Sequence, residues 1–450
     1  MRKILFFDYD SIALAKGFSK TPHSPQKSLH NPLFIADKPW EFSNFTMYGT
    51  AVYNKSEGLF KLWYTSVDSP WALRLYYAES CDGLCFVRPE LPVHQHHGRW
   101  TNRVHPEDLH GAAILLDEAD GNPDRRYKML AGIGSGPIQA FFSADGKNWQ
   151  TPFPYPAIPS KPDCPMGLCR LQDGRYLATY RLRGEGRRTY MSESWDFVFW
   201  SEPRLIYESD ASDPPGTQVY GFGVAPYGGY LLGTPWLYHM DADDWRTMNG
   251  WQETELAYAR NQTCWHRLVP GRPFLQGAVT GTWESGNLQM SSMPIYLENE
   301  IRYYYAATNR RHSKHWELEP QSAGLGMAIL RPDGFVSLDA GETEAFFQTR
   351  AIRLSSGTLR LNAVTGADGY VAVSILDTDR KPLPGVQELP VFSGDSINHV
   401  IRLGFVPEEP VIVMLRAKNA SVYAVAFDDM QDECSPYYQF SLIKGVRTGL

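Results

Sequence analysis

The sequence predicts an all-β protein, a five-bladed β-propeller followed by a C-terminal β-sandwich. Three observations predict this fold: a composition rich in aromatic residues, a turn motif that recurs five times, and two expected strands ahead of each copy of the turn. Of the 450 residues, 43% are hydrophobic and 13% are aromatic, with 25 Tyr, 22 Phe and 13 Trp. Aromatic residues in short apolar runs, separated by Gly and Pro, favour strands over helices.

The recurring turn has the form Ser-x-Asp-Gly-x-x-Trp, in which Asp-Gly is a signal for a tight turn between two strands. The copy at 143–149 is complete, the copy at 80–86 has Phe in place of Trp, and the copy at 194–200 lacks only the Gly. A degraded copy begins at Ala259 and a partial one at Arg331. Spacings of roughly 50 to 70 residues leave room for one four-stranded blade per copy.

Two expected strands precede each turn in the same order. The first strands consist of small and apolar residues, which suit a crowded inner position: 49–54, 111–117, 167–171, 221–227 and 291–297. The second strands follow after short polar turns: 60–66, 127–133, 176–182, 230–236 and 301–308. This succession, in five ordered copies, predicts a propeller over residues 31–342.

The two ends of the chain lack this pattern. Residues 1–30 are expected to form an extended arm. Residues 343–450 are expected to form a β-sandwich and a C-terminal tail, because apolar and polar residues alternate over 358–364, 369–376, 410–418 and 422–427. Asp8 and Asp10 interrupt the apolar run near the N-terminus, so no signal peptide is predicted and a cytoplasmic location is expected.

Composition argues against several classes of function. The net charge of −7, without tracts of Lys or Arg, argues against a nucleic-acid partner. No apolar stretch has the length of a membrane-spanning helix, so no membrane association is predicted. The six cysteines show neither metal-ligand nor disulfide spacing. His94, His96 and His97 cluster, but a surface loop is favoured there over a metal site. No metal or cofactor is predicted, and the oligomeric state is left open.

In a propeller the inner strands surround a funnel and begin at one face, to which the second strands return. Functional side chains are therefore expected just before the first strands and just after the second strands. The candidates before the first strands are Glu41, Tyr48, Glu107, Asp108, His110, Asp163, Asp213, Gln218, Tyr220, Glu284 and Gln289. The candidates after the second strands are Trp71, Arg181, Arg183, Trp236, His239, Arg310, Arg311 and His312.

Carboxylates that converge with aromatic rings suit carbohydrate chemistry. Two carboxyl groups across a glycosidic bond divide the roles of acid and of base or nucleophile, and aromatic faces stack on sugar rings. The catalytic candidates are Asp163, Glu107, Asp108 and Glu284, and the other side chains of the ring are candidates for substrate binding. The predicted partner is a carbohydrate substrate. For each carboxylate taken alone, a solvated loop residue is the alternative.

The predicted propeller and sandwich resemble the furanosidase-type glycoside hydrolases, above all family 32 and more distantly families 43, 68 and 130. Residues 163–168, Asp-Cys-Pro-Met-Gly-Leu, are similar to the Glu-Cys-Pro-x-Leu motif of that family, whose acidic residue is the general acid. The resemblance implies this role for Asp163. The family's Asn-Asp-Pro-Asn-Gly nucleophile motif has no counterpart, and Glu-Asp-Leu-His at 107–110 stands in place of its Arg-Asp-Pro motif.

Three functions follow from these residues. The first is a glycoside hydrolase in which Asp163 works with Glu107, Asp108 or Glu284. The second is a glycoside phosphorylase or an enzyme for an anionic sugar, because Arg suits bidentate binding of phosphate, sulfate or carboxylate. Its candidates are Arg181, Arg183, Arg187, Arg188, Arg310 and Arg311, for which pairing with the funnel carboxylates is the alternative. The third is a carbohydrate-binding propeller without catalysis, which the absence of the nucleophile motif favours.

Overall fold

The structure is a computed structural model, and it describes residues 2–41, 45–69, 72–134, 136–151, 153–159, 162–182, 184, 186–241, 249–277, 281–312, 323–386 and 389–427. The fold is all-β, as predicted: the regular elements of these residues are strands and one 3₁₀ turn, Pro123–Arg125. The chain divides into two compact units. Of the described residues, unit 1 holds 2–24 and 330–427, and unit 2 holds 25–329. Within the described ranges, no helix has the length and apolar character needed to cross a membrane.

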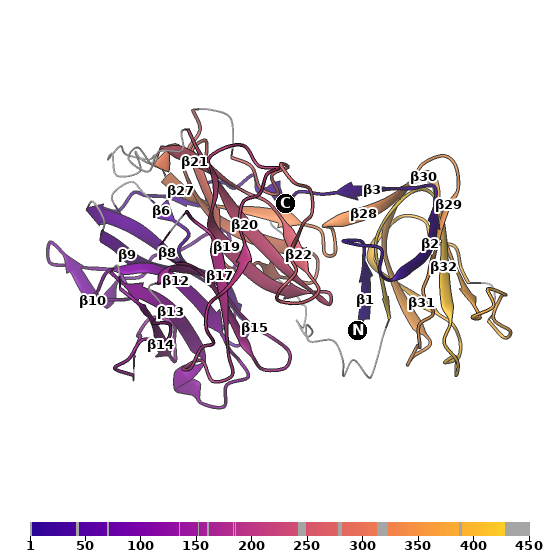
Figure 1. Cartoon of the computed structure of the whole chain (residues 1–450), viewed down its shortest axis with the longest axis horizontal. Coiled ribbons are helices and arrows are strands. Elements are labelled where there is room, and N and C mark those ends of the chain that lie inside the picture. Colours follow the sequence, from indigo (N-terminus) through magenta and orange to yellow (C-terminus); the bar gives the residue numbers. More distant parts are fainter. Residues whose placement is uncertain are drawn as a thin grey trace. The chain divides into compact units, whose positions relative to one another are not determined.

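Unit 1 is one eight-stranded sheet, which Figure 1 shows as a curled layer. Its strands are β1 (Arg2–Leu5), β2 (Ile12–Lys16), β3 (Phe18–Pro22), β28 (Val336–Ala340), β29 (Ala345–Thr349), β30 (Thr358–Leu376), β31 (Asp395–Arg402) and β32 (Ile412–Phe427). The expected strands 358–364 and 369–376 are one continuous strand, β30, whose register with β32 shifts between Thr365 and Tyr370. The long strand β32 pairs with β1, β28, β29 and β30 and so organises the sheet.

The N-terminal segment differs from the extended arm expected over 1–30. β1 pairs with β32, β2 with β29 and β3 with β28, all antiparallel. Phe6 and Phe7, which follow β1, are buried, and the ring of Phe6 meets that of Phe347 edge-on, with 5.8 Å between the ring centroids. The segment is therefore part of the sheet and core of unit 1, and its pairing partners lie at the far end of the chain.

The strands of unit 2 follow the order of the sequence repeat. The first sheet holds β6 (Phe45–Thr46), β7 (Ala51–Asn54), β8 (Leu59–Ser69) and β9 (Ala72–Ser80). The second holds β12 (Leu109–Leu116), β13 (Tyr127–Ile133) and β14 (Ile138–Ser143), and the third β15 (Pro162–Arg170), β16 (Tyr176–Leu182), β17 (Thr189–Ser194) and β18 (Arg204–Tyr207). A separate hairpin holds β10 (Leu91–His96) and β11 (Arg99–Thr101).

The remaining strands of unit 2 form an eleven-stranded sheet made of two groups. One group is β19 (Thr217–Tyr227), β20 (Tyr230–Met240), β21 (Gly250–Thr254), β22 (Ala257–Ala259) and β23 (His266–Arg267). The other is β24 (Asn287–Met290), β25 (Ile295–Tyr296), β26 (Ile301–Thr308) and β27 (Ala323–Leu330), with β4 (Gln26–Lys27) and β5 (Phe34–Ile35). One parallel pair, Gln252 with Asn287, joins the two groups. The strands predicted over 127–133, 176–182 and 301–308 coincide with β13, β16 and β26.

The recurring turn has the same geometry in its first three copies. The Ser hydroxyl accepts a hydrogen bond at 2.9 Å from the backbone N–H three residues later, which belongs to Gly83, Gly146 or Phe197. The Asp carboxylate of each copy accepts two more from the backbone, at 2.8 and 2.9 Å. The residue after the Asp has φ of 73°, 76° and 68° in turn. Glycine adopts this left-handed conformation without steric cost, whereas Phe197 adopts it as a fully buried side chain.

Hydrogen bonds join the first strands of the sheets in unit 2. The backbone N–H of Ala112 in β12 donates to the carbonyl of Tyr48 at 3.0 Å. The hydroxyl of Thr50, beside β7, accepts from the N–H of Ile114 at 3.0 Å and shares a 2.7 Å hydrogen bond with Ser292. The N–H of Val224 in β19 donates to the carbonyl of Ser292 at 3.2 Å. These bonds bring residues 48–50, 112–114, 224 and 292 together although they are far apart in the sequence.

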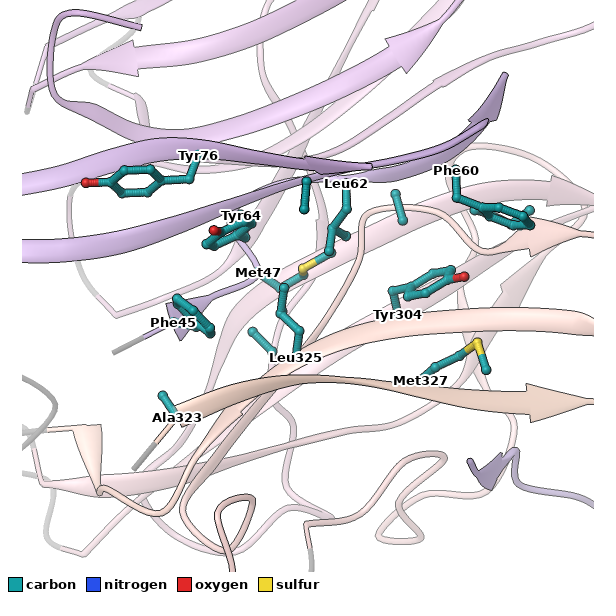
Figure 2. Close-up of a cluster of buried hydrophobic side chains, with 14 of the residues drawn as sticks. Phe45, Met47, Phe60, Leu62, Tyr64, Tyr76, Tyr304, Ala323, Leu325 and Met327 are labelled. Atoms are coloured by element: carbon teal, nitrogen blue, oxygen red, sulfur yellow. The ribbon is translucent and has the colours of Figure 1, made fainter. Parts of the chain in front are cut away.

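The first and last strands of unit 2 are held together by backbone pairing and by a hydrophobic core. β4 and β5 both pair with β27. Figure 2 shows the core where side chains of the first sheet meet those of β26 and β27: Phe45, Met47, Phe60, Leu62, Tyr64, Tyr76, Tyr304, Ala323, Leu325 and Met327. Removing this much apolar surface from water strongly favours the contact between the two ends of the unit.

Candidate functional site

Three predicted residues, Asp163, Arg181 and His110, meet at the beginning of β15. The Asp163 carboxylate lies 2.8 Å from Nη2 of Arg181 in β16 and 3.3 Å from Nδ1 of His110 in β12. The pairing of β15 with β16 is irregular between Pro162 and Pro165, on either side of Asp163. Irregular strand positions of this kind commonly re-aim a side chain beside a functional site. The carboxylate of Asp163 therefore lies between two nitrogen groups from neighbouring strands.

The guanidinium of Arg181 is the most deeply buried charge of this group, with 3% of its side chain exposed against 23% for Asp163. Burial is the largest single influence on the pKa of Arg181 and lowers it, but the Asp163 carboxylate together with Tyr220, Tyr48 and Cys164 outweighs burial and raises that pKa above its usual value. Nε and Nη1 have no hydrogen-bond partner among the described residues. Both nitrogens are covered by protein atoms, so the absence of an acceptor costs free energy that an acceptor atom reaching them would recover.

Aromatic side chains border this ion pair. The rings of Tyr48 and Tyr220 are nearly parallel, at 6.3 Å between centroids, and the ring of Tyr48 is also nearly parallel to that of Trp236, at 6.2 Å. The Tyr48 hydroxyl donates to the Tyr220 hydroxyl at 2.7 Å, and the Tyr220 hydroxyl lies 3.0 Å from Nε2 of His312. Burial raises the pKa of Tyr48 well above its ordinary value, so this phenol stays neutral.

A second guanidinium lies over the same aromatic group. The Arg181 guanidinium is 4.4 Å and that of Arg187 is 5.3 Å from the centroid of the Tyr220 ring. Arg187 also lies 5.1 Å from the ring centroid of Tyr238 and donates to Oε1 of Gln218 at 2.8 Å. Burial lowers the pKa of Arg187, and burial raises that of Tyr238 to about 12. Two cations around one ring give this part of the site a positive potential.

His239 belongs to a separate polar group on β19, β20 and β21. Its Nε2 lies 3.0 Å from a carboxylate oxygen of Glu253, and its Nδ1 lies 3.1 Å from the Thr217 hydroxyl. The imidazole also lies against the ring of Trp251, at 4.3 Å between centroids. The pairing register places His239 opposite both Thr217 and Trp251, which explains how three strands contribute to one group.

Three predicted carboxylates are held in ion pairs elsewhere in unit 2. Glu284 lies 2.9 Å from Nζ of Lys27 and accepts from the hydroxyl of Tyr305 at 2.7 Å. Glu41 is fully buried, lies 2.7 Å from Arg88 and accepts from Tyr64 at 2.6 Å; burial raises its pKa in spite of these partners. Asp213 lies 2.7 Å from Arg267. The described contacts of these three side chains do not include Asp163, Arg181 or His110.

The remaining predicted residues have varied surroundings. Glu107 is exposed, and its backbone N–H donates to Nδ1 of His105 at 3.2 Å. Asp108 forms an ion pair with Arg74, and Arg311 forms one with Asp241. The backbone carbonyl of Arg310 accepts from Asn287 at 2.8 Å. Trp71 and Arg183 lie outside the described residues.

The candidate ring did not include Glu253, Trp251 or Tyr238. β20 continues to Met240, beyond the end predicted at 236, and this extension brings Tyr238 into strand pairing. No residue range was assigned from the sequence to the strand that lies between each second strand and the turn, which in this group is β21 followed by β22, so Trp251 and Glu253 were not considered. Their alternation with Gln252 over 250–254 is a strand-like signal that the sequence itself carries.

In the described part of the chain, no group of three or more His, Cys, Asp or Glu side chains is arranged to hold a metal ion. In the predicted histidine cluster, the ring of His96 contacts the rings of Trp40 and His97 instead, at 6.1 and 4.3 Å between centroids. The imidazole of His96 thus has aromatic neighbours.

No known family model and no curated protein matches the sequence. Solved structures are similar in fold. One is described with the family 130 mannoside phosphorylases, which contain glycoside hydrolases that target β-1,2 mannosidic linkages in Candida mannan. It is 18% identical to this chain, and the match covers 71% of this chain and 95% of that chain, with a TM-score of 0.46. A glycosyl hydrolase from Bacteroides ovatus is 16% identical, with 69% and 95% covered and a TM-score of 0.47.

A third similar structure is an N-acetylgalactosamine deacetylase from F. plautii in complex with blood group B trisaccharide. It is 16% identical, with 70% of this chain and 96% of that chain covered and a TM-score of 0.47. At these identities the likeness concerns the fold. One of these structures is described with family 130, which the sequence resemblance named as a more distant relative.

Proposed function

We propose that unit 2 is a five-bladed β-propeller that acts on a glycosidic bond, with Asp163 as a catalytic carboxylate. The observation that carries this proposal is the meeting of Asp163, Arg181 and His110 beside the aromatic group of Tyr48, Tyr220 and Trp236. A carboxylate between hydrogen-bonding groups and aromatic faces provides both the proton transfer and the stacking that glycoside chemistry requires.

The five-blade count is supported by the order of the strands. Each of the first three sheets contains one of the five predicted pairs of strands. Each of the two groups in the eleven-stranded sheet contains one of the other two pairs. The pairing of β4 and β5 with β27 suits a propeller whose first and last segments close the ring. For unit 1 we propose a sandwich, because β30 and β32, with 19 and 16 residues, are long enough to pass from one layer into a second.

We propose that Asp163 enters the reaction as an ionised carboxylate. An adjacent guanidinium favours the charged form of a carboxyl group, and His110 adds a second nitrogen at the other oxygen. An ionised carboxylate suits a general base or a nucleophile. The proton-donor role that the family resemblance implies would need the charge of Arg181 to be compensated, as it would be by an anionic group of the substrate.

The second carboxylate of the reaction is proposed to be Glu107. It lies three residues before His110, it is exposed, and Arg103 binds the neighbouring backbone carbonyls of His105 and Pro106. Glu107 is thus carried by an anchored loop while its side chain remains accessible. Asp108 and Glu284 are less suited to this role because each is paired with a cation, Arg74 and Lys27 respectively.

A second candidate function is action on an anionic sugar, or phosphorolysis. The observation in its favour is the buried guanidinium of Arg181, whose Nε and Nη1 have no partner among the described residues, together with the half-buried cation Arg187 over the same Tyr220 ring. A carboxylate, sulfate or phosphate oxygen would satisfy these donors and balance the charge.

The test is turnover of aryl-glycosides, fructans, and uronate-containing and sulfated oligosaccharides by the wild type and by Asp163→Asn, each with and without inorganic phosphate. We expect Asp163→Asn to lose at least about 10²-fold in rate, the lower range for general acid–base catalysis. Asp173→Asn, in the exposed turn between β15 and β16, is the matched control. Full activity of Asp163→Asn would overturn its catalytic role, and rates that depend on phosphate would identify a phosphorylase. Substrate binding without turnover by the wild type would identify a binding protein.

A further inference from the structure

An exposed aromatic patch lies at the end of the strands opposite the candidate site. Trp195 and Phe199 are 70% and 68% exposed, in the turn that follows β17. Ser194 pairs with Tyr176 at the start of β16, whereas Arg181 lies near the end of that strand. Five strand positions correspond to roughly 17 Å. The patch is therefore separate from the group around Asp163.

The repeat itself provides a control for the role of these two aromatic side chains. The turn has the same hydrogen bonds in its first three copies. The positions equivalent to Trp195 and Phe199 hold Cys81 and Cys85 in the first copy and Ala144 and Asn148 in the second. The turn therefore forms without aromatic residues at these positions. The side chain of Phe199 has no role in closing the turn, and that of Trp195, whose ring centroid lies 5.7 Å from the guanidinium of Arg175, has none in it either. Large apolar side chains grouped at an exposed position in this way indicate an interaction site.

The patch continues onto the loop between β14 and β15. The ring of Tyr155, which is 43% exposed, lies nearly parallel to that of Phe199, at 6.2 Å between centroids. Phe153 lies beside Tyr155, at 5.7 Å, and lines a cavity of about 430 Å³. The cavity lies within the usual range for small-molecule sites. Its other lining residues are mainly polar and include Asn122, Asp124, Asn148 and Gln150.

We propose that Tyr155, Trp195 and Phe199, together with the adjoining cavity, form a second carbohydrate-binding site that holds a polysaccharide chain away from the catalytic site. Flat aromatic faces fit the C–H faces of sugar rings, and the amide and carboxylate groups of the cavity fit their hydroxyls. Three partly exposed rings offer at most a few hundred Å² of apolar surface. A stable protein interface buries about 800 Å² per partner, so a sugar chain suits this surface better than a protein does.

The test is native electrophoresis in gels that contain soluble mannan, inulin or polygalacturonate, with the double variant Trp195→Ala/Phe199→Ala. We expect at least one polysaccharide to retard the wild type, and the double variant to bind it roughly tenfold more weakly, which equals 1.4 kcal/mol. Trp100→Ala, which removes an exposed aromatic side chain of β11, is the matched control and is expected to be retarded like the wild type.

Two results would overturn the proposal: no retardation of the wild type by any of the three polysaccharides, or equal retardation of the double variant. Sedimentation of the same proteins tests the competing role in self-association. A change of oligomeric state in the double variant, without a change in retardation, would assign the patch to a protein contact. Turnover of small aryl-glycosides is expected to be unchanged in the double variant, so failure of this site is distinguishable from failure of the proposed catalytic function.

Discussion

Arg181 and Asp163 form the ion pair around which the candidate site is arranged, with 2.8 Å between Nη2 and the carboxylate oxygen. The two members of the pair differ in burial, since the guanidinium is covered by the aromatic group while the carboxylate is partly exposed. Removing one partner of such a pair leaves a charge that neither water nor protein compensates well. A substitution of either Arg181 or Asp163 is therefore expected to change both the stability of the site and its reactivity.

Replacing Arg181 by Lys is expected to lower kcat/KM for acidic substrates by roughly 100-fold. Lys keeps the positive charge beside Asp163 but lacks the planar fork and the two further N–H groups. The value of kcat/KM for neutral substrates is expected to fall much less. Steady-state kinetics on matched uronate and neutral glycosides measure this difference, with Arg188→Lys, at an exposed ion pair with Glu208, as the control. Equal losses on both substrates would exclude an anion subsite at Arg181.

The stability of the protein is expected to fall as the pH falls below about 6.5, in part because of His105. Burial outweighs the nearby Glu107 carboxylate and lowers the pKa of His105. The folded pKa therefore lies below the unfolded value, and stability is lost as the pH falls from about 6.5 through the folded pKa. His105→Asn keeps an acceptor for the N–H of Glu107 and removes the titrating group, so it is expected to flatten this dependence.

Urea unfolding between pH 7.5 and 5.5 measures this effect. His97→Asn, at an exposed position with a positive φ of 49°, is the control and is expected to keep the slope of the wild type. The same slope in His105→Asn as in the wild type would show that other groups cause the dependence.

Gly146→Ala is expected to destabilise unit 2 by about 2–4 kcal/mol. Its φ of 76° is unfavourable for alanine, and a Cβ would lie 2.5 Å from Cζ2 of the buried Trp63 ring. Gly58→Ala is the control, because Gly58 has a similar φ of 67° but no atom within 4 Å of the added Cβ. It is expected to cost only about 1 kcal/mol. Denaturant unfolding compares the two, and equal costs would argue against the close contact with Trp63.

Asp145→Ala is expected to lower the free energy of unfolding by about 1–2 kcal/mol at neutral pH, and Asp145→Asn is expected to lower it much less. Burial by itself raises the pKa of Asp145, but hydrogen bonds from the backbone of Asn148 and Lys147 outweigh it and lower that pKa. The stabilisation is present above the unfolded pKa of about 3.9 and is lost as the pH falls through the folded value. Asn261 already accepts two backbone hydrogen bonds in the fourth copy of the turn, so an amide suffices for the geometry.

Unfolding of Asp145→Ala and Asp145→Asn at pH 7 and pH 3 measures both effects, with the exposed Asp368→Asn as the control. The difference in the free energy of unfolding between the wild type and Asp145→Ala is expected to be smaller at pH 3 than at pH 7. A difference that stays constant with pH would mean that the carboxylate charge contributes nothing.

The features that could be predicted are those whose hydrogen bonds are local. The turn at Ser143, Asp145 and Gly146 closes through bonds between residues two or three apart, so its residues appear together in the sequence. Strands such as β13 and β16 were predicted with their observed bounds, because short apolar runs between polar turns mark where strands begin and end. The same reasoning placed Asp163 and Arg181 among the candidates at one face of the predicted propeller, without pairing them with each other.

Other features depend on partners that are distant in sequence. β1 pairs with β32, and no property of residues 2–5 alone indicates that partner. Likewise, the positions of Glu41 and Glu284 beside inner strands suggested substrate binding and catalysis. The structure adds that Glu41 is paired with Arg88 and Glu284 with Lys27, and the local sequence pattern could not assign these cations to them.

Periodicity and turn chemistry thus specify strands and turns, because backbone hydrogen bonds in a turn and the alternation of a strand involve residues close in sequence. Tertiary packing decided which carboxylate lies beside which cation. It placed Asp163 between Arg181 and His110, and it left two N–H groups of Arg181 without a partner among the described residues. Those ion pairs depend on how separate sheets pack against one another. The free energy of a charged side chain depends more on the groups packed around it than on its neighbours in the sequence.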